Sequence, residues 1–367
     1  MAVAAPAVTS RTSLIIIAAV AVGFTLYFLR GILTPLALAL FLAVMIDGFA
    51  RLLKDRIPGF PARAAMPAAV VFSVLLLGLT LWFVAANAAG FVNQLIHYGP
   101  RIDGRIAQGA DFLGVAAPPP VRELIGRFNP ARYIGAVAGG FQNFASDAVF
   151  VLIYLGFIIA SRRGFSQKAR KLFRDDAERQ EAGKTFDRIR SGVERYLWIQ
   201  TVTGLMIAVG SWVAMAAVGL DSALFWAFLI FLASYIPIVG GVIGVALPPV
   251  FALVQFETWW QAFLLLGILQ GVQFVVGNVI QPRMQGDSLN MDPVVVLLAL
   301  AFWSLVWGLP GAFLSTPLAV MTMVILAQFE GGRRIAILLS ADGDPLGADE
   351  TQARMSRRKK SATKPSS

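Results

Sequence analysis

The sequence has no cysteine, a single histidine at position 97, and charged residues at only 14% of its 367 positions. Without cysteine it can form no disulfide, no thiolate metal site and no cysteine nucleophile. It also lacks the H-E-x-x-H pattern of zinc hydrolases. We therefore expect no enzymatic activity, no metal site and no cofactor.

Apolar residues make up most of the sequence. Hydrophobic residues make up 57% of the chain and the mean hydropathy is +0.71, which leaves too little polar surface for a soluble globule of this length. The net charge of +10 invites comparison with nucleic-acid-binding proteins, but the 31 Lys and Arg residues lie in the gaps between apolar runs. In that position they act as topology signals, so we expect a lipid bilayer and no nucleic acid as partner.

The apolar runs predict an all-α polytopic membrane protein with about eight hydrophobic segments. These are residues 14–28, 32–49, 66–91, 147–160, 196–220, 222–254, 258–280 and 293–329. The sixth and eighth segments are each interrupted near the middle, by YIPIVGG at 235–241 and by WGLPG at 307–311. Each whole run is too long for one straight crossing, whereas an arm of about 14 to 18 residues rises only about 21 to 27 Å, short of a ~30 Å hydrocarbon core.

Two topologies remain open for the interrupted segments: both cross the membrane as kinked helices, or both form re-entrant hairpins. Hairpins produce an inverted repeat, and paired interruptions of this kind mark transporter binding sites. Basic residues set the orientation. Four lie in 50–65, eleven in 161–195 and eight after Phe329, which predicts that both termini are cytoplasmic.

Three stretches carry a resemblance to a known family. SYIPIVGGVIGVALPP begins at Ser234, GNVIQPRMQG at Gly277 and PVVVLLALAFWSLVWGLPGAFLSTPLAV at Pro293, and all three resemble signature regions of the autoinducer-2 exporter family. The resemblance implies an inner-membrane transporter of bacteria, multi-pass and homo-oligomeric, with a pentamer suspected. In some relatives the substrate is the quorum signal autoinducer-2, and others are linked to sodium or lithium/proton antiport.

From these observations we predict five segments with different roles. We expect 1–92 to be a scaffold of transmembrane helices, 93–145 an extracytoplasmic segment, and 146–195 a transmembrane helix followed by a cytoplasmic basic helix. Residues 196–329 are expected to form the transport region, and 330–367 a basic, partly disordered cytoplasmic tail. The predicted function is export of a small polar, hydroxyl-rich solute such as autoinducer-2 by an elevator-like alternating-access mechanism. Na⁺(Li⁺)/H⁺ antiport and a passive channel or facilitator are the alternatives.

Candidate substrate-binding residues are the uncharged polar groups inside apolar runs together with the Gly and Pro residues of the two interruptions. They are Gln200, Thr203, Tyr235, Pro237, Gly240, Gly241, Gln270, Asn278, Gln281, Pro282, Gly308, Pro310, Gly311, Ser315 and Thr316. The alternative for any one polar residue is that it joins helices to each other. Gln281 stands where family members often have an acidic residue, and Ile238 where many have Asn, which weakens any inference of ion coupling.

Two carboxylates are candidates for coupling to protons. Asp47 and Asp292 lie near predicted span ends, where ionisable groups at membrane depth are costly and often functional. A carboxylate at such a place also serves as a helix cap or a partner of the helix dipole. Asp292, directly before Pro293, fits the cap especially well.

Overall fold

The computed structural model describes residues 7–58, 60–114, 146–161, 164, 175–285, 290–329 and 331–345, which are helical apart from turns and short connections. Among them, five helices are long and apolar enough to cross a membrane: Arg30–Arg56, Arg63–Val84, Ala182–Val218, Trp260–Gln285 and Pro293–Gln328. Shorter apolar helices cover Ile16–Phe28, Ser146–Ser161, Ala223–Ser234 and Val239–Gln255. Since a helix satisfies its backbone hydrogen bonds internally, this is the all-α architecture that a bilayer requires.

The chain divides into two compact units. Unit 1 comprises Met1–Ala43, Phe150–Val193 and Asn290–Ser367, and unit 2 comprises Val44–Val149 and Glu194–Leu289. Helices α2 (Arg30–Arg56) and α7 (Asp176–Val218) each contribute to both. Helix α7 runs without a break from the charged residues before 196 into the apolar run that follows.

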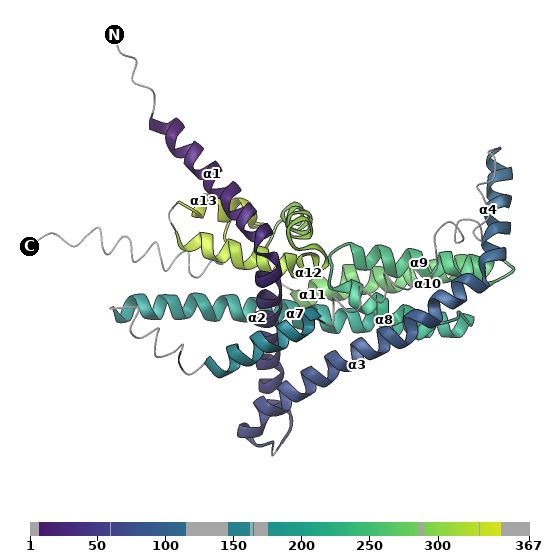
Figure 1. Cartoon of the computed structure of the whole chain (residues 1–367), viewed down its shortest axis with the longest axis horizontal. Helices are drawn as coiled ribbons and strands as arrows, with labels where there is room; N and C mark the ends of the chain where they lie inside the picture. The colour runs from purple at the N-terminus through teal and green to yellow at the C-terminus, as the bar shows by residue number, and fades with distance from the viewer. Residues whose placement is uncertain are drawn as a thin grey trace, which may run out of the picture. The chain divides into compact units, whose positions relative to one another are not determined.

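Unit 2 is built around the first interrupted segment. It contains α3 (Ala62–His97), α4 (Gly99–Leu113), α8 (Ala223–Ser234), α9 (Val239–Gln255), α10 (Trp260–Val275), the π-helical segment η1 (Val276–Ile280) and α11 (Gln281–Gln285). Figure 1 shows α8, α9 and α10 beside one another in green. These helices share one apolar core with α7. Its fully buried side chains include Met215 of α7, Ile230 of α8, and Leu265 and Leu269 of α10.

Helices α8 and α9 form an antiparallel hairpin. Ile230 packs against Gly244 near the tip, the rings of Trp226 and Phe251 lie 5.6 Å apart farther down, and the backbone N–H of Asp221 donates to Gln255 at the open end. The break falls at residues 235–238, inside the predicted YIPIVGG interruption. At 12 and 17 residues the arms rise about 18 and 26 Å, so each is shorter than a ~30 Å hydrocarbon core.

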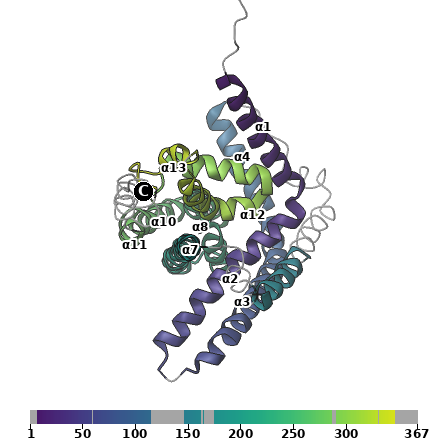
Figure 2. The same ribbon diagram turned by 90° about the vertical axis from the view of Figure 1, so that its left-hand side faces the viewer.

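In unit 1 the second interrupted segment is also folded back. Helix α12 (Pro293–Gln328) has non-helical backbone at Gly308, with φ 66° and ψ −141°. Its two ends lie close together, because Met291 pairs with Ser340, which follows the short helix α13 (Arg333–Leu339). The chain from Gln328 to Ser340 is far too short to span a straight 36-residue helix of about 54 Å. Figure 2 shows the ribbon of α12 reversing in its middle.

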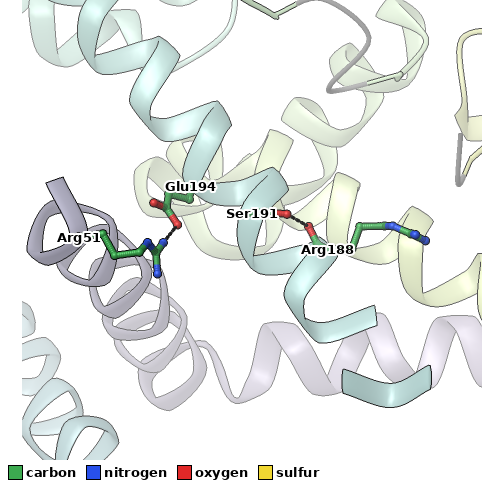
Figure 3. Close-up of polar contacts among 4 residues, drawn as sticks. All are labelled: Arg51, Arg188, Ser191 and Glu194. Carbon is green, nitrogen blue, oxygen red and sulfur yellow. Dashed lines mark hydrogen bonds and ion pairs between the residues drawn. The ribbon is translucent and has the colours of Figure 1, made fainter. Parts of the chain in front are cut away.

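One ion pair joins α2 to α7. In Figure 3, Arg51 of α2 points to Glu194 of α7 and forms an ion pair with it, while Ser191 donates to the carbonyl of Arg188 within α7. Gly48 makes room for the carboxylate: a Cβ on it would lie 2.6 Å from Oε1 of Glu194. Both residues of this pair belong to unit 2. Because both side chains are partly exposed, the pair should contribute less than about 1 kcal/mol to stability.

Candidate functional site

A chain of uncharged hydrogen bonds joins the tip of the α8/α9 hairpin to α7 and α11. Gln281 Nε2 donates to Gln200 Oε1 over 2.9 Å, and Gln200 Nε2 donates to the carbonyl of Ser234 over 2.8 Å. The hydroxyls of Thr201 and Tyr235 lie 2.7 Å apart. We call these five residues the tip cluster. It brings together Gln200, Tyr235 and Gln281, three of the residues predicted from the sequence.

Small residues allow the helices to approach closely enough for these bonds. Gly204, one turn after Gln200 on α7, lies directly against Ser234 Oγ, and its absent Cβ would sit 3.3 Å from Ser234 Cβ. A Cβ on Gly240 would come within 2.6 Å of Ser234 Cα and 2.7 Å of the Ala233 carbonyl. Gly240 is therefore required by backbone approach at the tip, as the sequence predicted.

The positive-φ residue of this tip is not one of its glycines. Ile238, which precedes α9, has φ 66° and ψ −45°. A β-branched residue at positive φ is a genuine outlier, and such strain costs roughly 1–3 kcal/mol. Gly240 and Gly241 both lie within α9 and have helical backbone. The strained position is thus one of the two at which the sequence departs from the family that it resembles.

A π-helical turn precedes Gln281. In a regular α-helix Pro282 would clash with the carbonyl four residues earlier, that of Asn278. The segment Val276–Ile280 is instead π-helical, and the N–H of Gln281 bonds to the carbonyl of Val276, five residues back. Single π turns of this kind occur frequently at functional sites. The wider turn gives the chain a place for Pro282 without ending the helix before Gln281.

The open end of the hairpin is held by stronger contacts than its tip. Gln255 bridges both arms, since its Oε1 accepts from the N–H of Asp221 and its Nε2 donates to the carbonyl of Gly219. From α4, Arg101 donates to the carbonyl of Gln255 over 2.6 Å, and Arg105 to that of Glu257 over 2.5 Å. Guanidinium groups at the last carbonyls of a helix also complement its dipole.

Tyr98 adds a further bond at this end. Its hydroxyl donates to Asp221 Oδ2 over 2.6 Å. Burial raises the pKa of Tyr98 to about 12, and the hydrogen bond to Asp221 and its negative charge act in the same direction. The hydroxyl therefore stays protonated and able to donate throughout the physiological pH range. Through Arg101 and Arg105, helix α4 is bonded to the open end of the α8/α9 hairpin.

Unit 1 holds the remaining predicted residues of the interruptions. Gly308 supplies the positive φ at the bend, and Gly311 lies directly against the carbonyl of Trp303. Trp307 fixes the bend to α1 (Ala7–Phe28), because its Nε1 donates to the carbonyl of Leu26 over 3.1 Å. Pro310 lies in the same bend, within α12.

Two buried hydroxyls follow the bend in α12. Ser315 donates within its own helix to the carbonyl of Ala312. Thr316 is 4% exposed, and its hydroxyl has no hydrogen-bond partner among the described residues. A buried hydroxyl without a partner is costly, which makes Thr316 the stronger of the two candidates for solute contact.

Several predicted residues do not join the tip cluster. Thr203 and Asn278 donate to carbonyls of their own helices, at Ile199 and Phe274, which fits a structural role. The other three do not bond to the cluster either. Pro237 lies in the tip turn, Pro282 follows Gln281, and Gln270 is exposed one turn before the end of α10.

The two predicted coupling carboxylates have different settings. Asp292 is the N-cap of α12: its Oδ1 accepts from the N–H of Val294 over 2.7 Å, and Pro293 follows it. This is the cap geometry that the sequence offered as the alternative to coupling. Asp47 lies half-buried in α2. Among the described residues, no three His, Cys, Asp or Glu side chains gather where they could hold a metal ion.

Comparison with known proteins identifies the family of this chain. The model of the AI-2E family transporter matches residues 14–331. The chain belongs to this family. It is 26% identical to the AI-2 transport protein TqsA of Escherichia coli K12 over 322 residues, covering 85% of this chain and 90% of that protein.

Other AI-2E-type relatives are described only as transport proteins. "Putative transport protein YhhT" of E. coli K12 is 26% identical over 314 residues, which cover 84% of this chain and 88% of that protein. "Putative permease PerM" of the same organism is 22% identical over 197 residues, 53% of this chain and 54% of its own length. Membership in the AI-2E family makes the protein a multi-pass membrane transporter, as the resemblance implied.

The AI-2E chain also brings polar residues into the site that the sequence prediction did not select. Ser234 and Thr201 belong to the tip cluster, and Gln273 of α10 lies next to it. The sequence showed all three as polar residues in apolar runs. One further signal was available, because Gln270, Gln273, Gly277 and Gln281 follow each other at intervals of three and four, the spacing of one helical face.

Proposed function

We propose that this AI-2E transporter exports a small, neutral, hydroxyl-rich solute, such as autoinducer-2, across the bacterial inner membrane. The observation that carries the proposal is the tip cluster, which consists entirely of amides, hydroxyls and backbone groups at the break of a membrane-type hairpin. Groups that both donate and accept hydrogen bonds match hydroxyls in a solute, whereas an ion would lack a charged partner there. The name of the relative TqsA supports autoinducer-2 as the first solute to test.

The proposed mechanism is alternating access in which the broken segments re-enter the membrane and return to the side they left. Each arm of α8/α9 is too short to cross alone, and the bend of α12 brings its ends together. Two such hairpins of opposite orientation would form the inverted repeat of an elevator-like carrier. We further propose cytoplasmic termini and a homo-oligomer, with a pentamer as the expected assembly.

Flux measurements in proteoliposomes of the purified protein test this function. The panel is autoinducer-2, polyols, Na⁺ and Li⁺, with protein-free liposomes as control. We expect saturable flux of autoinducer-2 or a polyol and no protein-dependent Na⁺ or Li⁺ flux. Cation flux coupled to proton movement, without solute flux, would support the antiporter instead. Solute flux that does not saturate would indicate a channel.

A further inference from the structure

We propose that Gln273 is the residue that recognises the solute, through its side-chain amide. The inference rests on the proposed function and assigns a role within it. Gln273 lies in the last turn of α10, directly before the π-helical segment. It reaches the start of α9, where the tip of the hairpin ends.

The hydrogen bonds at the tip leave Gln273 as the available amide. Both polar atoms of Gln200 are engaged, one by Gln281 and one by the carbonyl of Ser234. Gln200 and Gln281 therefore act as positioning residues that hold α7, the hairpin tip and α11 together. Gln273 forms no hydrogen bond with any other residue in the described part of the chain, although it is half-buried in an apolar helix. An amide in such a place gains by binding a polar partner.

Two glycines keep the space beside this amide open. A Cβ on Gly241 would lie 3.4 Å from Gln273 Nε2, and one on Gly277 would lie 3.7 Å away. Gly240 is needed because the hairpin backbone fills the space beside it, whereas, among the described residues, the only atoms outside its own helical turn within 4 Å of a Cβ on Gly241 belong to the side chain of Gln273. The missing side chain at Gly241 leaves room next to the amide, which is what a solute would need.

The chemistry of the amide defines the solute class. A carboxamide offers two N–H donors and one carbonyl acceptor and carries no charge. It therefore pairs well with a hydroxyl, which donates and accepts, and discriminates against an analogue in which that hydroxyl is replaced by hydrogen. When a site built to bond a hydroxyl meets an analogue without it, its polar group is left unpaired and affinity falls steeply.

The test compares variants in proteoliposomes, with autoinducer-2 and xylitol as probes. Gln273→Leu is expected to raise the apparent KM by about tenfold or more, with a maximal rate within about twofold of the parent. Gly241→Ala should raise the apparent KM as well, because its methyl group lies beside the amide. Gly271→Ala is the matched control, since nothing lies within 4 Å of the Cβ it adds.

Two readouts separate recognition from a structural role. The ratio of the apparent KM for a deoxy analogue to that for xylitol should fall toward one in Gln273→Leu. Solute should also no longer raise the thermal midpoint of that variant in detergent. Gln273→Asn, which keeps the amide but shortens it, should retain part of the discrimination. If the parent moves neither probe, the proposed function fails and this inference with it. If the parent transports and Gln273→Leu and Gly241→Ala keep its KM and discrimination, only this inference is overturned.

Discussion

At the scale of single residues, Ile238 combines an unfavourable backbone with an exposed side chain. With φ 66° and ψ −45° it is the central residue of a γ-turn, closed by a 2.7 Å hydrogen bond from the N–H of Val239 to the carbonyl of Pro237, and this positive-φ form of the γ-turn is rare and strained. Its side chain is 58% exposed, so packing does not compensate the strain. The strain is located at the tip of a hairpin next to the tip cluster. Strained backbone is frequently found where a protein binds or switches.

Relief of this strain should stabilise the protein. Ile238→Gly is expected to raise the free energy of unfolding by about 1 kcal/mol, because Gly adopts positive φ without a Cβ clash and such backbone strain costs about 1–3 kcal/mol. For a chain of this size that corresponds to a rise of roughly 2 °C in the thermal midpoint in detergent. Ile238→Val is the control, because it keeps the branching and should not stabilise. Equal midpoints in Ile238→Gly and Ile238→Val would show that the positive-φ backbone is not strained.

Gln281 provides a second residue-scale prediction. In Gln281→Glu an ionised carboxylate would face Gln200 Oε1, which is an acceptor, and turning the Gln200 amide would break its bond to Ser234. Burial and the acceptor both disfavour the charged form, so the pKa of the new carboxyl should be raised. Flux should then become pH-dependent, highest below that raised pKa and lost as pH rises through it. Gln270→Glu, at an exposed position of α10, should leave the pH profile flat. A flat profile in Gln281→Glu too would remove Gln281 from the transport path.

At the scale of elements, the α8/α9 hairpin is held unequally at its two ends. The open end is fixed by two arginines of α4, by Tyr98 and by the bridging Gln255. The tip is held by neutral amide and hydroxyl bonds. Hydrogen bonds to neutral groups contribute about 0.5–1.5 kcal/mol and those to charged groups about 1.5–3 kcal/mol. Motion of the hairpin should therefore begin at its tip.

A disulfide can test this motion, since the parent has no cysteine. In Gly204→Cys/Ser234→Cys the two Cβ atoms would start 3.3 Å apart, close to the separation in disulfides, so oxidation should lock the tip to α7. Transport should stop on oxidation and return on reduction. A pair within the hairpin, Ile230→Cys/Gly244→Cys, should tolerate oxidation because both arms move together. Full transport with the 204–234 bond formed would show that the tip does not separate from α7.

The positions of the elements were more predictable than their internal details. Gly and Pro residues indicated both breaks, at 235–241 and 307–311, because these residues disfavour a continuous helix. The π turn at Val276–Ile280 was not predicted, because it depends on how the chain accommodates Pro282 inside an otherwise regular helix. Positive φ at Ile238 was missed because a β-branched residue disfavours it; the tight reversal imposes it, with the N–H of Val239 bonded to the carbonyl of Pro237.

The tip cluster was predicted only in part for a similar reason. Polar residues inside apolar runs identified Gln200, Tyr235 and Gln281, but the sequence could not show which of them meet in space. The contact of Gln200 with the Ser234 carbonyl requires α7 to pass the hairpin tip at Gly204. A hydroxyl that bonds to its own helix, as in Thr203, looks the same in sequence as one that faces a site.

At the scale of the whole molecule, the account depends on how the broken segments relate to the membrane. If α8/α9 and α12 are re-entrant, α10 enters from the outside and leads to the cytoplasm, and the two segments form an inverted repeat. If both cross, the same helices run in the opposite direction and no inverted repeat exists. The family membership is compatible with transport in either case, so the elevator-like mechanism needs a separate test.

Accessibility of two single cysteines tests this central claim most directly. Glu257→Cys lies at the open end of the α8/α9 hairpin, and Asp287→Cys follows α11, just outside the described residues. With re-entrant hairpins, a membrane-impermeant thiol reagent added from outside should label Glu257→Cys in intact cells and leave Asp287→Cys unmodified until the cytoplasmic side is exposed. The Cys-free parent gives the background. Labelling of Asp287→Cys but not Glu257→Cys from outside would contradict the re-entrant topology and the mechanism built on it.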